Sequence, residues 1–251
     1  MTDNNHEEEM AEGTLLYHLI ELRSRLLIIA VAVLVAFIIL LPFSRDIFTL
    51  VSEPLREVLP GNAMIATAVA SPLLTPFKLT FFAALFLVMP VVLFQVWNFI
   101  APGLYKNEKK FAIPLLITSI ILFYLGIAFA YFVVFPLIFG FFTSIAPEGV
   151  EVQTDITQFL DFITTIVFAF GIAFEVPVAT VLIVWAGLTN IEKLAKARPY
   201  VFLMAFIAGM FLTPPDVISQ SLLAVPVYLL YELGIIMSKV FVSKKSESDS
   251  S

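Results

Sequence analysis

The sequence contains no cysteine, which excludes disulfide bonds, thiol chemistry and cysteine metal sites. Its two histidines, His6 and His18, are too few for a histidine metal centre. The ten glycines never lie closer than nine residues apart, so there is no P-loop or dinucleotide-binding loop. No H-E-x-x-H motif is present, and no serine and histidine set fits a catalytic triad. We therefore expect no metal, no cofactor, no catalytic residues and no enzymatic activity.

Charge is also scarce. Only 14% of the 251 residues are charged, against about 25% in a soluble domain, and 60% are hydrophobic. The mean hydropathy is +1.00. These values predict an all-α integral membrane protein. The two ends are polar, and we expect residues 1–12 and 243–251 to be mobile tails around one membrane domain.

Long uncharged runs divide the chain into spans, because a spanning helix needs about 20 mostly apolar residues. We predict six helices, at about 25–43, 76–97, 111–136, 157–186, 200–213 and 217–238. The fifth has room for only about 14 helical residues between Pro199 and Pro214, or about 21 Å. It is therefore shorter than a hydrocarbon core of about 30 Å, and the bilayer would have to thin around it.

The basic residues indicate the orientation. With six spans, eleven of the fourteen lysines and arginines fall on the side that carries both ends. Positive residues mark the cytoplasmic face, so both termini are predicted to be cytoplasmic. Without the hairpin at 200–238 the orientation would be unchanged, but the apolar stretch VFLMAFIAGMFLTP would lie in water. Six spans are therefore the better prediction.

The stretch FGIAFEVPVA places Glu175 within an apolar segment, two residues before Pro177. The small neighbours Gly171 and Ala179 would leave space beside its carboxyl group. Pro177 has no N–H, so the carbonyl of Ala173 loses its helical partner. One interpretation is a wet, functional site within the membrane. The other is a protonated glutamate that hydrogen-bonds to a neighbouring helix.

Three further segments carry charge or proline in informative places. TLLYHLIELRSRLL pairs Glu21 with Arg25 at helical spacing and is typical of a surface helix that anchors the first span. NFIAPGLYKNEKK holds one acid, Glu108, among three lysines, where it could capture a cationic partner. Asp216 of FLTPPDVISQ is a natural N-cap. Pro54 lies in RDIFTLVSEPLREVL, which can form an amphipathic helix on the membrane surface.

Together, these segments resemble the TatC family, the large membrane subunit of the twin-arginine protein translocase. HLIELRSRL, WNFIAPGLYKNEKK, FEVP and LTPPD carry the resemblance, and SPLLTPFKLTF, FAYFVVFPLIFGFF and SIAPEG are similar as well. The match runs in order from about residue 14 to 240. It implies six helices in a cupped bundle in the bacterial cytoplasmic (inner) membrane.

The resemblance also implies a function, the export of folded proteins that carry a twin-arginine signal peptide, driven by the proton gradient. It assigns signal-peptide binding to Glu21, Arg23, Phe99 and Glu108. This sequence has Lys109 and Lys110 after the glutamate, where arginines are frequent in the family.

The remaining assignments concern the membrane. The resemblance places Glu175 on the concave, membrane-exposed face, and it places docking of the single-helix subunits TatA and TatB near Met210, Thr213 and Gln220. Pro54 and Asp216 are expected to be structural residues on the periplasmic side. Self-association and contact with the lipid bilayer are also expected, whereas nucleic acid is not.

Two alternatives remain open. A proton-coupled small-solute transporter would use Glu175 as its carrier site, but it predicts repeated halves and further midplane polar groups, which the sequence does not show. A scaffold that never contacts cargo is the other alternative.

Overall fold

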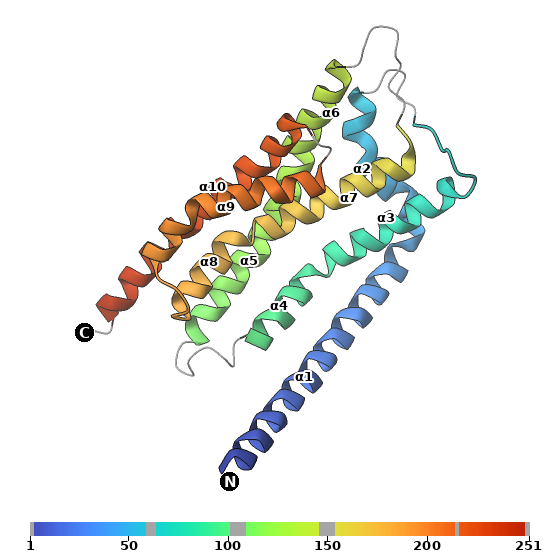
Figure 1. Cartoon of the computed structure of the whole chain (residues 1–251). Helices are drawn as coiled ribbons and strands as arrows, with labels where there is room; N and C mark the ends of the chain where they lie inside the picture. Colours follow the sequence, from blue (N-terminus) through green and yellow to red (C-terminus); the bar gives the residue numbers. More distant parts are fainter. Residues whose placement is uncertain (1–2, 59–63, 101–108, 146–153, 214–215, 249–251) are drawn as a thin grey trace.

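The computed structural model describes residues 3–58, 64–100, 109–145, 154–213 and 216–248. Within these ranges the chain is helical apart from turns and one isolated β-bridge between Ile65 and Asp155. The elements are α1 (Asp3–Leu40), η1 (Leu41–Phe43), α2 (Ser44–Val58), α3 (Ser71–Leu87), α4 (Met89–Ile100), α5 (Lys109–Phe129), the π-helical turn η4 (Ala130–Val134), α6 (Phe135–Ser144), α7 (Ile156–Ala173), α8 (Val176–Trp185), α9 (Ile191–Leu212) and α10 (Val217–Ser248) (Figure 1).

The spans agree with the prediction in number and order. Five helical segments among the described residues are long and apolar enough to cross a membrane, and α3 with α4 makes a sixth if this pair, bent by 49°, is one span. The start of α1 and the end of α10 lie at the same end of the molecule, as an even number of crossings requires (Figure 1). The chain is thus a multi-pass membrane protein.

The observed bounds differ from the predicted ones mainly where charge was treated as a boundary. α1 begins at Asp3 and α10 runs to Ser248, so helix extends into both stretches that we expected to be mobile tails. The fifth helix begins at Ile191 rather than near 200, because Pro199 is tolerated inside α9. Glutamate, lysine and alanine favour helix, so a polar segment next to a span can continue it.

Two groups of helices make up the molecule. In one, α1 packs against α3 and α4, with Val33, Ala36, Ala84 and Val88 between them. In the other, α7 packs against α5, and α10 packs against α8 and α9. The largest buried cluster lies in the second group and includes the fully buried rings of Phe135 and Phe170. α7 joins the groups through its contact with α3 (Figure 1).

Tyrosine hydroxyls satisfy backbone carbonyls that prolines leave without partners. Pro54 lies inside α2 and has no N–H for the carbonyl of Leu50. Tyr131 of η4 donates to that carbonyl at 2.7 Å. In the same way, Pro90 has no N–H for the Phe86 carbonyl at the α3–α4 bend, and Tyr124 donates to that carbonyl at 3.0 Å. α2 is the helix predicted over 45–59, and it packs against α3 and α6.

Candidate functional site

Arg25 joins α1 to the last turn of α4. Its Nε and Nη2 donate to Oε1 of Glu21 at 3.1 and 2.5 Å, one helical turn earlier. Its Nη1 donates to Oε1 of Gln95 at 3.0 Å, and Nη2 also donates to the backbone oxygen of Asn98 at 3.0 Å. The side chains of Glu21 and Arg25 are each 20% exposed, so their ion pair is partly shielded from solvent.

This arrangement follows from the local sequence. Glu21 and Arg25 are four residues apart with the acid first, the favourable order on a helix. Asn98 is among the last residues of α4, whose carbonyl groups have no intrahelical partners and attract a cation. Both bonds from Arg25 to Glu21 end on Oε1, so the pair occupies only one of the two carboxylate oxygens.

The other predicted recognition residues lie at the same end of the molecule or outside the described residues. Phe99 is half-buried and follows Asn98 in α4, and Arg23 is exposed on α1. Glu108 lies outside the described residues, directly before the start of α5 at Lys109. The structure therefore brings Glu21 to the end of α4 that carries Phe99. Among the described residues, Arg23 is not one of the groups that Arg25 contacts.

Glu175 lies in the break between α7 and α8. α7 ends at Ala173, and α8 begins at Val176 with Pro177 in its first turn. Phe174 and Glu175 form the turn between the two helices. Oε2 of Glu175 accepts a hydrogen bond at 2.5 Å from the hydroxyl of Ser119 on α5. Oε1 is buried and has no hydrogen-bond partner among the described residues. The predicted weakening of the helix at the glutamate is confirmed, and Ser119 is a partner that the sequence did not indicate.

The expected space beside Glu175 is filled on one side. A Cβ at Gly171 would lie 2.6 Å from the ring of Phe123, so this glycine accommodates a phenylalanine of α5 and leaves no gap. A Cβ at Gly126 would lie 2.5 Å from the carbonyl oxygen of Phe170. α5 and α7 therefore touch closely just before the break, which holds Ser119 next to Glu175. Ala179, the other small neighbour, is exposed.

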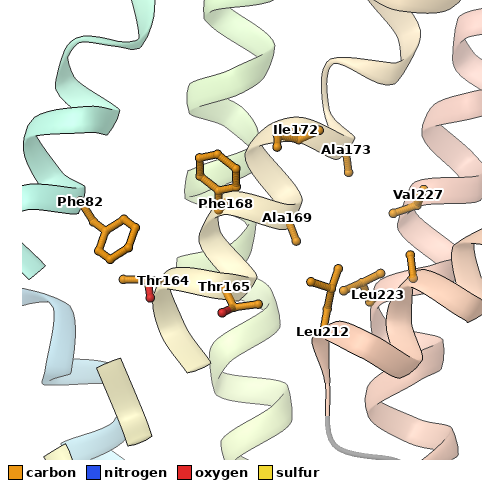
Figure 2. A pocket seen from close by; sticks show the side chains of 11 residues that line it. Phe82, Thr164, Thr165, Phe168, Ala169, Ile172, Ala173, Leu212, Leu223 and Val227 are labelled. Atoms are coloured by element: carbon orange, nitrogen blue, oxygen red, sulfur yellow. The ribbon is translucent and has the colours of Figure 1, made fainter. Parts of the chain in front are cut away.

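An apolar groove of about 480 Å³ runs beside the same helix (Figure 2). Figure 2 shows Phe82 of α3 on one side of α7, and Leu212, Leu223 and Val227 of α9 and α10 on the other. Ile172 and Ala173, at the end of α7, line the part of the groove next to the break that carries Glu175.

Asp155 organises the end of the molecule opposite the termini. Its Oδ1 accepts from the backbone N–H groups of Thr157 and Gln158, which caps α7. Its Oδ2 accepts from the N–H and hydroxyl of Thr67 at 2.9 and 2.7 Å, which ties the segment before α3 to α7. The hydrogen bonds from the Thr67 hydroxyl and amide are the main cause that lowers the pKa of Asp155 to about 2.

The residues expected to dock partner helices lie in the hairpin formed by α9 and α10. Met210 is half-exposed on the last turn of α9. Thr213 is buried, and its hydroxyl donates to the Gly209 carbonyl at 2.9 Å. Gln220 is half-buried, and its backbone would lie 3.5 Å from a Cβ at Gly209, so α9 and α10 are close there. Asp216 caps α10, as predicted, by accepting from the N–H of Ser219 at 2.7 Å.

Comparison with known proteins shows which family combines these features. The family model described as Sec-independent protein translocase protein (TatC) matches residues 17–226. The chain belongs to the TatC family. A TatC of Azotobacter chroococcum is 61% identical over 222 residues, which cover 88% of this chain and 87% of that protein. A TatC of Escherichia coli K12 is 57% identical over 231 residues, covering 92% and 90%.

A solved structure agrees with this assignment. The crystal structure titled as the twin-arginine translocase receptor TatC superposes with a TM-score of 0.79 at 36% identity, covering 89% of this chain and 98% of that one. The chain is therefore a multi-pass component of the Tat translocase in the bacterial inner membrane, and it is not an enzyme. Protein translocation is favoured over the solute-transporter alternative.

One ionic cluster of this TatC-family chain was missed in the sequence. Arg198 of α9 donates through Nε and Nη2 to the two carboxylate oxygens of Glu232 on α10, at 2.6 and 2.8 Å. Tyr228 donates to Oε1 of the same glutamate at 3.0 Å. The sequence could have revealed this pair, because Arg198 and Glu232 carry opposite charges and lie at similar distances before and after the turn of the predicted hairpin at 200–238.

Proposed function

We propose that this TatC-family chain is the receptor for signal peptides with two consecutive arginines, and that Glu21 supplies one carboxylate to them. The observation that carries the proposal is the Arg25 network. It holds Glu21 against the end of α4 while using only one oxygen of the carboxylate. The second oxygen, Oε2, can accept N–H donors from the guanidinium of a bound peptide.

Glu108 is the second proposed acid. It precedes α5, which begins at the same end of the molecule as the end of α4 (Figure 1). Two carboxylates at one end match the two guanidinium groups of the peptide. We place this end and both termini in the cytoplasm, as the distribution of basic residues indicates. Labelling of single-cysteine variants at 108 from outside intact cells would contradict this orientation.

The decisive experiment is binding of a twin-arginine signal peptide to the purified protein. Glu21→Gln and Glu108→Gln should each weaken binding about tenfold or more, since a hydrogen bond to a charged group contributes ~1.5–3 kcal/mol. A twin-lysine peptide should bind the wild type weakly and should lose little more in the variants. Glu192→Gln, at an exposed acid near the start of α9, is the matched control. Equal binding by wild type, Glu21→Gln and Glu108→Gln would refute the receptor assignment.

Arg25 acts in this proposal as a positioning residue for Glu21. Arg25→Lys keeps the charge but cannot contact Glu21, Gln95 and Asn98 simultaneously. It should weaken peptide binding in the wild type and have no further effect in the Glu21→Gln background. A purely structural role would instead give the same loss in both backgrounds.

We propose that TatA and TatB dock along α9 and α10, and that the apolar part of a signal peptide lies along the concave face toward Glu175. The half-exposed Met210 supports the first point, and the groove that ends beside the α7–α8 break supports the second. The chain has no cysteine, so Met210→Cys would report crosslinking without background. Ile121→Cys, exposed on α5, is the control. Crosslinks of equal strength from both positions would contradict docking at α9.

Glu175 would keep this face polar within the membrane, and the proton gradient would drive transport. Whether Glu175 must titrate can be tested directly. Glu175→Gln keeps a polar group beside Ser119 but cannot ionise. Export by Glu175→Gln at the wild-type rate, with loss in Glu175→Leu, would assign a hydrating role, whereas loss in both would assign a proton-carrying one.

A further inference from the structure

The ion pair between Lys78 and Asp161 lies in an unusual place. Lys78 belongs to α3 and Asp161 to α7, both within membrane spans, and their side chains are 49% and 55% exposed. Asp161 is six residues, or about 9 Å along the helix, beyond the cap at Asp155. Lys78 is seven residues, or about 10 Å, beyond the start of α3. Charged groups at membrane depth normally face the bundle interior or a water-filled cavity.

This pair stands at one end of the apolar groove described above. Phe82, one helical turn after Lys78, lines the groove, as do Thr164 and Thr165, one turn after Asp161 (Figure 2). Both threonine hydroxyls donate to backbone carbonyls of α7, at 2.7 Å from Thr164 to Leu160 and from Thr165 to Asp161. The groove therefore presents an apolar surface that begins directly beside two opposite charges.

The depth of the charges matches that of the nearby hairpin. Leu212, the last residue of α9, lines the same groove as Thr165. The polar turn that carries Asp216 thus lies close to the level of Lys78 and Asp161. Because a polar turn between two spans marks the membrane surface, lipid headgroups can reach this level beside α7.

We propose that the groove binds a phosphatidylethanolamine molecule when no cargo is present, with its acyl chain along α7 and its headgroup at Lys78 and Asp161. The ammonium of Lys78 faces the phosphate, and the carboxylate of Asp161 faces the primary ammonium of ethanolamine. Lys78 has three N–H donors and Asp161 two acceptor oxygens, so the ion pair between them leaves capacity for both contacts. An anionic headgroup would satisfy Lys78 but meet repulsion from Asp161.

Lipid titration of the purified protein, followed by native mass spectrometry, tests this proposal. The probes are phosphatidylethanolamine, phosphatidylcholine and phosphatidylglycerol with identical acyl chains. The wild type should bind phosphatidylethanolamine about threefold more tightly than phosphatidylcholine, which is the effect expected of one part-exposed hydrogen bond between charged groups. The quaternary ammonium of phosphatidylcholine has no N–H to donate to Asp161.

The variants distinguish contacts with the lipid headgroup from contacts with its acyl chain. Asp161→Asn should remove the preference for phosphatidylethanolamine and strengthen binding of phosphatidylglycerol. Lys78→Gln should weaken binding of all three lipids, and so should Ala169→Phe, which fills the groove. Arg198→Gln breaks a part-buried ion pair that does not line the groove, and it should leave the affinities for all three lipids unchanged. Thermal unfolding of each variant verifies that it is folded.

Three results would overturn the proposal. One is an unchanged order of lipid affinities in Asp161→Asn together with undiminished binding in Lys78→Gln. The second is undiminished lipid binding in a folded Ala169→Phe variant. The third is crosslinking of Thr165→Cys to a partner helix instead of lipid. None of these measurements involves a signal peptide, so their outcome is independent of the proposed receptor function.

Discussion

The hydrogen bond from Tyr131 to the Leu50 carbonyl gives a prediction that couples two distant positions. Tyr131→Phe removes the hydroxyl and leaves that carbonyl without the donor that replaces the missing N–H of Pro54. In Pro54→Ala the alanine N–H becomes available to the same carbonyl, so the tyrosine is no longer needed. The two substitutions should therefore not be additive.

The magnitude follows from the environment of the bond. The distance between the two oxygens is 2.7 Å, which is good geometry for a hydroxyl donor. A hydrogen bond of this kind contributes ~0.5–1.5 kcal/mol in a protein, and interhelical bonds in a membrane protein average about 0.6 kcal/mol. We expect Tyr131→Phe to reduce the free energy of unfolding by about 1 kcal/mol. In the Pro54→Ala background most of this loss should disappear.

The assay is denaturant-induced unfolding in mixed micelles of wild type, Tyr131→Phe, Pro54→Ala and the double variant. Tyr200→Phe, at an exposed tyrosine of α9, controls for loss of a hydroxyl alone. The reasoning would be wrong if the loss of unfolding free energy in the double variant equalled the sum of the two single losses to within about 0.3–0.5 kcal/mol. Such additivity would show that Tyr131 and Pro54 do not act on the same carbonyl.

Other predictions concern packing and charge. Gly234→Ala should destabilise the protein by ~1–3 kcal/mol, because the new Cβ would lie 2.9 Å from the α8 backbone. Gly140→Ala should not destabilise it, because a Cβ there has nothing within 4 Å. Unfolding of the two variants measures this difference. Arg198→Gln should lower the unfolding temperature by leaving Glu232 unpaired, and adding Glu232→Gln should recover part of the loss. Asp155 has a pKa of about 2 when folded and about 3.9 when unfolded, so its contribution to stability is complete above pH 4 and declines as the pH falls toward 2. Melting temperatures of Asp155→Asn should lack this part of the pH dependence, and an identical decline in that variant would contradict the assignment.

Hydropathy and basic residues were sufficient to predict the spans and their order, because both are properties of long segments. Details that depend on contacts between segments were not predictable. The space expected beside Glu175 contains the ring of Phe123, from a helix about 50 residues earlier in the chain. Nothing in the spacing around Gly171 distinguishes a glycine that leaves a gap from one that receives a ring.

In the candidate site, too, features within one segment were predictable and contacts between segments were not. The Glu21–Arg25 pair was visible as helical spacing, but its contacts with Gln95 and Asn98 require the end of α4 to meet α1. Pro177 predicted a lost hydrogen bond at Ala173, but the helix was predicted to be continuous over 157–186, whereas it divides into α7 and α8. Ser119 could not be assigned to Glu175, because the register of α5 against α7 is set by packing at two glycines.

The ion pair between α9 and α10 has a consequence for how the protein enters the membrane during synthesis. α9 has the lowest hydropathy of the five spans that are not sharply bent among the described residues, and it carries Arg198. That residue gains its counter-ion only when Glu232, 34 positions later, has been made. The last two spans should therefore insert cooperatively as a hairpin, and a nascent chain that stops before residue 232 should hold α9 in the bilayer less firmly.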